Sequence, residues 1–262
     1  MMLKKLSVCI ALAALAGCDS SSSPASSSAP AATSETKPAP AAKPTELYSM
    51  RPADNRWPAR QGQSELSDNL LAKNYYIVFD GSGSMDNTDC GDGKRKLDVA
   101  KTAVKKFVEQ LPADANVGVY AFDGQGVGER THLSTQNRPV VKQMIDQLVA
   151  GGGTPLSAGL EDGETALTAQ AGKQLGYGEY HLVIITDGLA SRGYETDGAV
   201  QSILQNTPIN IHTIGFCIGD DHSLHQPGLT FYRSASDPDS LMAGLNEVLA
   251  EAPDFTLLEF QQ

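Results

Sequence analysis

Residues 75–84 read YYIVFDGSGS, and this stretch decides the fold. The apolar run at 75–79 predicts a strand that is buried on both faces, which is typical of the interior of a parallel sheet. The run ends at Asp80, and glycine and serine alternate over the next four residues. The stretch therefore predicts a tight loop at the carboxyl end of a buried strand, with one carboxylate and two hydroxyl groups on it.

Two further segments have a similar character. One reads GGGTP at 151–155, and the other reads LVIITDG at 182–188, a second apolar run that ends in a carboxylate. The side chains of the three segments offer only hard oxygen donors with little total charge, and such donors suit Mg²⁺. The candidate ligands are Asp80, Ser82, Ser84, Thr154 and Asp187.

The rest of the chain alternates between strand and helix patterns. We expect strands at 75–79, 116–122, 181–186 and 209–216, with short edge strands at 130–133 and 230–233. We expect helices at 94–111, 139–149, 155–171, 197–205 and 237–249, the last with Asp237 as its N-cap. This alternation predicts an α/β fold with a doubly wound, mostly parallel sheet flanked by helices. Ligands of such sheets bind at the carboxyl ends of the strands, where Asp80 and Asp187 are expected.

The candidate ligands also carry a family resemblance. Asp80-x-Ser82-x-Ser84, then Thr154 in a Gly-Gly-Thr-Pro loop, then Asp187 in Thr-Asp-Gly, resemble the metal-ion-dependent adhesion site of a von Willebrand factor type A domain, whose fold is Rossmann-like. The alternative is that these are ordinary turn residues, because Gly, Asp and Ser dominate turns.

The resemblance implies a role for each ligand. Ser82 and Ser84 bind the ion through their hydroxyl groups, and Thr154 binds it directly or through water. Asp80 and Asp187 hold coordinated waters. The ion is Mg²⁺, with Mn²⁺ or Ca²⁺ as alternatives, and it keeps one coordination position for an Asp or Glu side chain of a partner protein. This implies a metal-dependent protein-binding module that is not an enzyme.

Two other functions stay open from the sequence. The domain is alternatively a scaffold or assembly factor for a cell-envelope complex, with the metal site as its latch. A third interpretation is a hydrolase that uses the ion to activate water, although the sequence offers no general base beyond the ligands themselves.

The start of the chain resembles a lipoprotein signal peptide at 1–17. An uncharged apolar stretch follows two lysines, and LAGC at 15–18 resembles a bacterial lipobox, in which Cys18 carries the lipid. The alternative is an ordinary secretory signal with a chance cysteine. A lipid on Cys18 predicts anchoring in the bacterial cell envelope, facing the periplasm. Asp19 resembles a signal for retention in the inner membrane.

Composition divides the remaining chain into four parts. Residues 18–56 are rich in Ser, Ala and Pro and poor in large apolar side chains, which predicts a disordered tether. We expect a lead-in segment at 57–69, the von Willebrand factor type A domain at 70–252 and a C-terminal tail at 253–262.

The charge of the chain excludes one class of partner. The formal net charge is −11, and removal of a signal peptide with Lys4 and Lys5 makes it −13. A chain this acidic repels phosphate backbones, so we expect no nucleic acid as ligand. We expect contact with the membrane only through the lipid anchor.

The cysteines predict one disulfide bond. Once the signal-peptide cysteine and Cys18 are set aside, only Cys90 and Cys217 remain, and in an oxidising compartment such a pair forms a bond. The alternative is two unrelated buried thiols. A second alternative places Cys217 in a zinc site with acids and histidines at 220–225, which we interpret instead as a polar loop near the rim of the sheet.

Overall fold

The computed structural model describes residues 57–58 and 65–250. The predicted signal peptide, tether and C-terminal tail lie outside the described residues, and so do Cys18 and Asp19. Within the described ranges, no helix combines the length and the apolar character that a membrane crossing requires.

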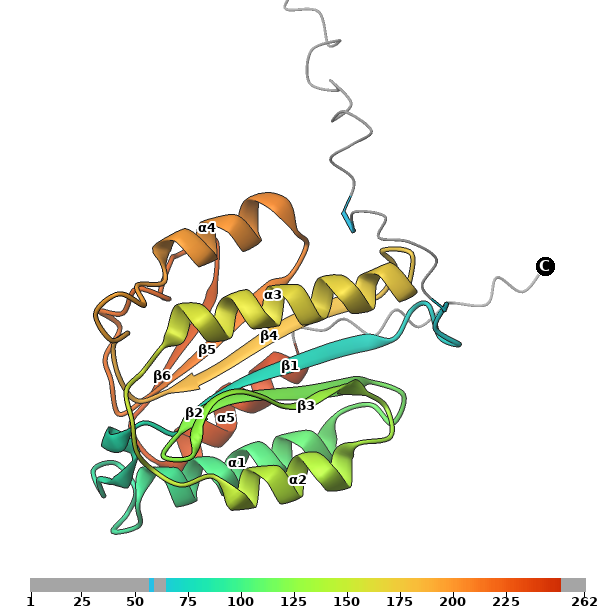
Figure 1. Cartoon of the computed structure of the whole chain (residues 1–262). Coiled ribbons are helices and arrows are strands. Elements are labelled where there is room, and N and C mark those ends of the chain that lie inside the picture. The colour runs from blue at the N-terminus through green and yellow to red at the C-terminus, as the bar shows by residue number, and fades with distance from the viewer. Residues whose placement is uncertain (1–56, 59–64, 251–262) are drawn as a thin grey trace, which may run out of the picture. The chain divides into compact units, whose positions relative to one another are not determined.

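The described chain forms one six-stranded sheet. The strands are β1 (Lys73–Asp80), β2 (Asn116–Asp123), β3 (Gly126–Ser134), β4 (Glu179–Thr186), β5 (Asn210–Phe216) and β6 (Phe231–Ala235). Their order is β3-β2-β1-β4-β5-β6, and each pairing is parallel except the antiparallel pairing of β2 with β3 (Figure 1). The direction in which strands are added reverses between β1 and β4, so this pair forms the switch point of the sheet.

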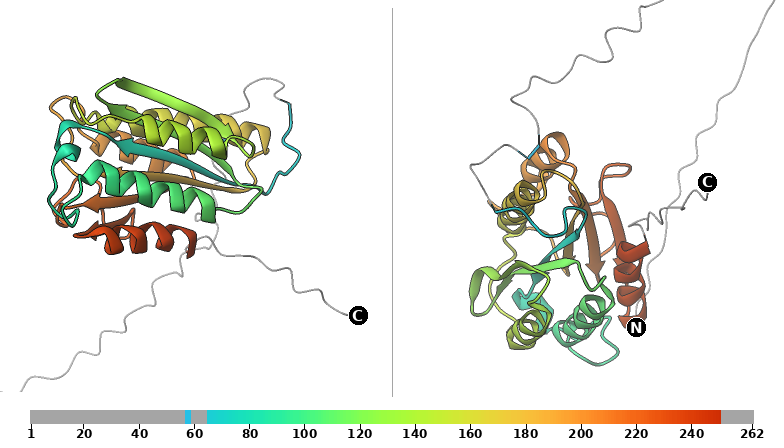
Figure 2. Two further views of the ribbon diagram at one scale, coloured as in Figure 1. Left: turned by 90° about the horizontal axis from the view of Figure 1, so that it is seen from below. Right: turned by 90° about the vertical axis from the view of Figure 1, so that its right-hand side faces the viewer.

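Helices cover both faces of the sheet. They are α1 (Lys96–Gln110), α2 (Arg138–Gln147), α3 (Leu156–Lys173), α4 (Asp197–Asn206) and α5 (Pro238–Ala250), and a short 3₁₀ turn, η3 (Gly83–Asp86), precedes α1. One face carries α1, α2 and α5, and the other carries α3 and α4 (Figure 1). On the first face α1 lies between α2 and α5 (Figure 2). The prediction of a doubly wound, mostly parallel α/β fold is confirmed.

The central strand β1 has an apolar layer on each side. Tyr75, Ile77 and Phe79 pack toward α1, whereas Tyr76 and Val78 pack toward α3. All five side chains are buried, as the uninterrupted apolar run predicted. Because full burial of one large apolar side chain stabilises a fold by about 1.5–3 kcal/mol, this run fixes β1 at the centre of the domain.

A glycine sets the distance between α3 and the sheet. A Cβ atom at Gly163 would lie 2.4 Å from Leu182 Cδ1 and 3.3 Å from Tyr76 Cδ1. Since real Cβ atoms do not approach other carbons this closely, the helix packs against β1 and β4 only because this position has no side chain.

The ends of the elements differ in places from the sequence predictions. Strand β3 spans Gly126–Ser134, whereas the sequence predicted only 130–133. The prediction was too short because two glycines weaken the local strand pattern, while pairing with β2 decides the structure. Asp237 was predicted correctly as an N-cap: its Oδ1 accepts a 2.8 Å hydrogen bond from the Ser240 N–H.

A row of ring side chains crosses the sheet near the amino ends of its strands. His181 stacks on Tyr75 with ring centroids 4.7 Å apart, and His212 stacks on Phe231 at 4.8 Å. His181 Nδ1 lies 3.1 Å from His212 Nε2, and both side chains are buried. Burial lowers the pKa of His181 to about 4 and that of His212 to about 3.

These buried histidines predict a loss of stability in acid. Their pKa values are depressed in the folded state, so the unfolded chain takes up protons first as pH falls below about 6.5. Stability is therefore complete above about pH 6.5 and falls toward pH 4 and below, by on the order of 3 kcal/mol for one such group. Urea denaturation of His212→Gln between pH 7 and pH 4 should show a weaker pH dependence than wild type. His132→Gln, which changes an exposed histidine, is the control. If stability depends on pH in His212→Gln as it does in wild type, the depressed pKa of His212 is not a source of the acid sensitivity.

Candidate metal-binding site

The first and second candidate loops meet at the carboxyl edge of the sheet. The Gly83 N–H donates to Gly152 O at 3.2 Å, and the Gly151 N–H donates to Gly81 O at 2.9 Å. These backbone bonds hold the serine loop after β1 against the glycine loop before α3. A Cβ atom at Gly81 would lie 2.7 Å from Asp123 Cβ, so the close packing of the serine loop against the end of β2 requires glycine.

Asp80 is fully buried at the end of β1. Its Oδ1 accepts a 2.8 Å hydrogen bond from the Ser82 N–H, and its Oδ2 accepts a 2.6 Å bond from the Thr186 hydroxyl. Burial raises the pKa of Asp80 to about 6, and the hydrogen bonds from Ser82 and Thr186 oppose this rise. The carboxylate is therefore held in one orientation by both of the strands that flank the switch point.

The two serines and Asp187 form a connected group. Ser82 Oγ and Ser84 Oγ lie 3.0 Å apart, and the Ser84 hydroxyl donates to Asp187 Oδ1 at 2.7 Å. Ser82 and Asp187 are buried, and Ser84 is half-buried. Three of the predicted ligands thus converge, although they come from positions 103 residues apart in sequence.

Thr154 is positioned by a residue that the sequence analysis missed. The Thr154 N–H donates to Ser191 Oγ at 2.9 Å, and the Ser191 N–H donates back to Thr154 O at 2.9 Å. Thr154 is buried, at 7% exposure. The loop after β4 therefore fixes the backbone of the glycine loop, so all three candidate segments are tied together.

The structure adds one cation to the site. Lys96, the first residue of α1, places its Nζ 2.9 Å from Asp187 Oδ2, and both side chains are buried. The sequence offered no signal for this contact, because a lysine in the first turn of an amphipathic helix normally faces solvent.

The donor set suits a hard divalent cation. Each of the five predicted ligands presents oxygen, and Mg²⁺, Mn²⁺ and Ca²⁺ prefer oxygen. The buried carboxylate of Asp187 already accepts a hydrogen bond from one cation, the ammonium of Lys96. The residues present therefore fit a metal of this class.

The alternative zinc cluster at 220–225 does not form. Cys217 is bonded to Cys90, and no group of three or more Cys, His, Asp or Glu side chains in the described ranges is arranged to hold a metal. His222 instead places its Nε2 3.0 Å from Gly188 O, beside the loop of Asp187, and the ring of His225 stacks on Tyr232. This segment is a polar loop next to the site, as predicted.

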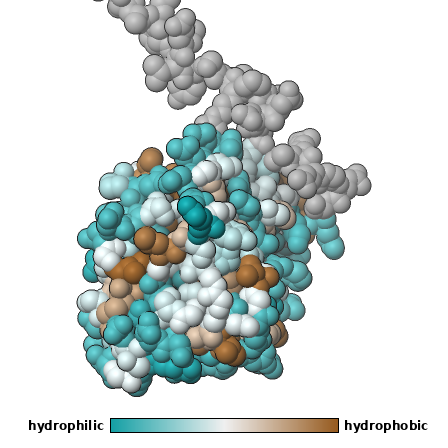
Figure 3. Space-filling view, turned by 60° about the vertical axis from the view of Figure 1, so that its left-hand side comes forward, coloured by the Kyte–Doolittle hydropathy of each residue, from teal (hydrophilic) through white to brown (hydrophobic). Residues whose placement is uncertain are grey.

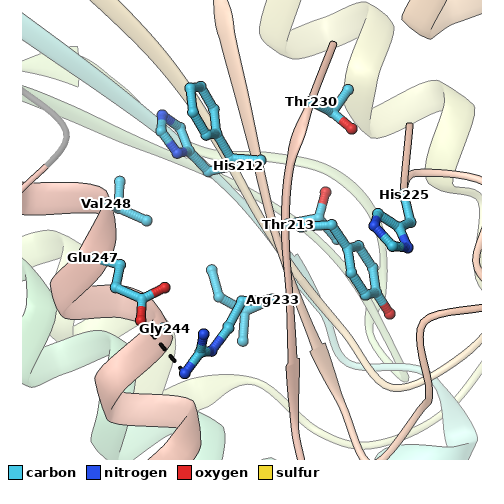
Figure 4. Close-up of a pocket in the computed structure, with 11 residues that line it drawn as sticks. His212, Thr213, His225, Thr230, Arg233, Gly244, Glu247 and Val248 are labelled. Atoms are coloured by element: carbon cyan, nitrogen blue, oxygen red, sulfur yellow. Dashed lines mark ion pairs between the residues drawn. The ribbon is translucent and has the colours of Figure 1, made fainter. Parts of the chain in front are cut away.

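A separate hollow of about 250 Å³ lies along β5, β6 and α5 (Figure 4). Arg233 and Glu247 flank it with an ion pair of 3.5 Å, and His212, Thr213 and His225 also line it. It contains none of the predicted ligands, so it plays no part in the candidate site.

The predicted disulfide bond is present. Cys90 and Cys217 are joined, with their Cα atoms 5.8 Å apart and their positions separated by 127 in sequence. Both residues have positive φ, at 58° and 63°, a conformation that costs a non-glycine residue about 1–2 kcal/mol. The bond clamps the loop between η3 and α1 to the end of β5, close to the candidate site.

Loss of this bond should lower stability strongly. Loop-closure entropy for a segment of this length is worth about 5 kcal/mol, an upper figure because denatured chains keep some structure. We expect guanidinium denaturation of Cys90→Ser/Cys217→Ser to show a loss of several kcal/mol against the oxidised wild type. Reduced wild type serves as the matched control, and a double variant as stable as the oxidised protein would contradict the prediction.

The fold and a family model together define a class of protein. Residues 75–189 match the model of the von Willebrand factor type A domain, and the doubly wound sheet agrees with that match. The chain therefore belongs to the von Willebrand factor type A domain family.

Two relatives are similar to this chain in sequence, and both are named as uncharacterized proteins. The uncharacterized protein YwmD of Bacillus subtilis is 30% identical over 159 residues, which are 55% of this chain and 67% of that protein. The uncharacterized protein sll0103 of Synechocystis sp. is 27% identical over 151 residues, which are 57% of this chain and 33% of that protein. The chain thus spans about a third of the length of the cyanobacterial relative.

Solved structures confirm the fold. A von Willebrand factor type A protein from Catenulispora acidiphila matches with a TM-score of 0.56 and 23% identity, over 70% of this chain and 43% of that one. The pilus adhesin SpaC of Lactobacillus rhamnosus GG matches with a TM-score of 0.53 and 16% identity, over 72% and 32%. The domain of the type V pili tip protein Mfa5 of Porphyromonas gingivalis matches with a TM-score of 0.54 and 13% identity, over 69% and 95%.

Proposed function

We propose that the domain is a protein-binding module whose contact with its partner depends on a metal ion. The ligands are those predicted from the sequence: Asp80, Ser82, Ser84, Thr154 and Asp187. The observation that carries the proposal is the convergence of Ser82, Ser84 and Asp187 within hydrogen-bonding distance of one another. Mg²⁺ is the proposed ion, and Mn²⁺ or Ca²⁺ would suit the same oxygens.

The site needs a ligand from outside the chain for this function. A bound ion would supply a positive charge that attracts a carboxylate oxygen of the partner. Asp80 and Asp187 each accept two hydrogen bonds within the domain, so both carboxylates are oriented by their own neighbours. An Asp or Glu side chain of the partner is therefore the proposed external ligand.

The surface near the site favours a protein partner. The loops at the carboxyl ends of the strands expose large side chains: Leu189 at 64%, Val149 at 50% and Tyr194 at 44%. The view from this side shows separate hydrophobic patches among polar and neutral residues (Figure 3). Protein interfaces combine apolar and aromatic contacts with a polar rim in the same way.

The structural neighbours support binding rather than catalysis. SpaC is a pilus adhesin and Mfa5 is a pilus tip protein. Their identities to this chain are below 25%, so they show the fold, and adhesion by this chain is part of the proposal. A scaffold in a cell-envelope complex would use the same site as a latch and is the second candidate.

We further propose that the domain is held at the cell envelope by a lipid on Cys18, facing the periplasm, and at the inner membrane if Asp19 acts as a retention signal. The sequence LAGC at 15–18 supports this proposal. We expect wild type in the membrane fraction, and we expect Cys18→Ala in the soluble fraction or unprocessed. Equal fractionation of the two proteins would remove the lipid anchor from the account.

The metal is tested by deleting one ligand oxygen. We expect wild type to bind Mg²⁺ with a Kd between micromolar and millimolar, because few of the ligands are charged. Ser84→Ala removes a direct ligand, so its affinity should fall at least about tenfold. Isothermal calorimetry on metal-stripped protein measures both values.

The control variant removes a serine hydroxyl group that lies away from the candidate metal site. Ser202→Ala, on α4, should bind Mg²⁺ as wild type does. Peptides with one Glu should bind the Mg²⁺-loaded protein more tightly than matched Gln peptides, and EDTA should abolish the difference. A wild type that binds neither Mg²⁺ nor Mn²⁺ would refute the metal site, whereas equal binding of the two peptides would refute the carboxylate contact.

A further inference from the structure

In the described part of the chain, one buried ion pair lies at the candidate site and joins Lys96 to Asp187. The Nζ–Oδ2 distance is 2.9 Å, and the side chains are 7% and 0% exposed. The neighbouring Arg95 also pairs with acids, Asp86 and Asp98, but those side chains are 46–63% exposed. Among the residues that the structure describes, Lys96 alone forms an ion pair with a predicted ligand.

Its position is unfavourable for a lysine on two counts. An ammonium loses its hydration when it is buried, and a buried ion pair recovers that free energy only in part. Lys96 is also the first residue of α1, where the helix dipole disfavours positive charge. Replacement of a whole buried ion pair by apolar side chains of similar volume is often neutral or stabilising, whereas loss of one partner leaves a buried charge without its counter-ion. Stability therefore accounts for Lys96 only as the partner of Asp187, and it gives no reason for the pair as a whole.

The pair changes the charge that a metal ion would meet. Asp80 and Asp187 are both buried at the site, and Lys96 offsets one of their two negative charges. A divalent cation then leaves the site with one net positive charge. With a neutral residue at position 96, the same cation would leave the site neutral.

We propose that Lys96 sets the charge of the metal site, so that the ion binds more weakly and the loaded site attracts a carboxylate more strongly. The inference rests on the metal site proposed above. Both effects have one cause, because a positive charge held a few ångströms away repels a cation and attracts an anion, and water screens it little at a buried site.

A purely structural counter-ion makes different predictions. If Lys96 only stabilised the loop of Asp187, its removal would distort the site and weaken metal binding or leave it unchanged. An increase in metal affinity on losing the lysine therefore separates the two roles.

The experiment compares Lys96→Met with Lys106→Met in the full chain. Both variants remove one positive charge from α1, but Lys106 is exposed and outside the site. Lys96→Gln is a second neutral variant, because its amide can still donate to Asp187 if the methionine variant folds poorly. Lys96→Arg keeps the charge and should behave as wild type in charge-dependent binding.

Metal affinity and stability are the first measurements. We expect calorimetry to show Mg²⁺ binding at least about tenfold tighter in Lys96→Met and Lys96→Gln than in wild type, with no change in Lys106→Met. In EDTA the Lys96→Met protein should unfold at lower urea than wild type, because Asp187 has lost its cation, and Mg²⁺ should raise its midpoint more than that of wild type.

Carboxylate binding is the second measurement. Acetate added to the Mn²⁺-loaded protein displaces a coordinated water and lowers the water-proton relaxation rate. We expect acetate to bind several-fold more weakly to Mn²⁺-loaded Lys96→Met and Lys96→Gln than to wild type or Lys106→Met.

The outcomes separate this inference from the proposed function. If the wild type and both neutral variants bind no Mg²⁺ or Mn²⁺, the metal site is refuted and this inference falls with it. If the wild type binds the ion, and the neutral variants bind it equally or more weakly, the metal site stands and the role given to Lys96 is wrong. If the neutral variants bind the ion more tightly but bind acetate as wild type does, Lys96 does not strengthen the attraction of a carboxylate.

Discussion

The parallel pairing of β1 with β4 is the constraint on which the candidate site depends. Phe79 pairs with Ile185 in this register, so the two strands end side by side, at Asp80 and Thr186. The Thr186 hydroxyl bonds to Asp80 across the pair, and Asp187 is the next residue. A slip of one residue would turn each side chain of β4 to the opposite face, so register and site are fixed together. The apolar layers on both faces of the sheet hold that register.

The candidate site contains buried carboxylates, and each buried carboxylate needs hydrogen-bond donors. Asp80 and Asp187 each accept two hydrogen bonds, and together their donors include a backbone N–H, two hydroxyl groups and the ammonium of Lys96. A buried carboxylate without such donors would lose several kcal/mol of hydration without compensation. The hydrogen bonds therefore allow two acids to sit together at the end of a hydrophobic core. They also hold the oxygens that we assign to the metal in place before it binds, which lowers the entropy lost on binding.

Much of the fold could be predicted because its signals are local. A short stretch of consecutive residues is enough to predict each of several features: the apolar runs of β1 and β4, the amphipathic pattern of α1 and the N-cap Asp237. The five candidate ligands were found because each follows or precedes such an element. The length of β3 was not predictable, since it depends on pairing with β2. Lys96 and Ser191 were missed for the same reason: each acts through a partner that is distant in sequence, Asp187 and Thr154.

The central claim is that the Ser82 and Ser84 hydroxyl groups bind a metal ion beside Thr154. Anomalous diffraction from crystals soaked in Mn²⁺ tests it most directly. The account predicts one anomalous peak about 2 Å from both serine Oγ atoms, with Asp80 and Asp187 close enough to hold its coordinated waters. A structure in which those two hydroxyl groups still bond to each other, with no anomalous peak beside them, would contradict the account.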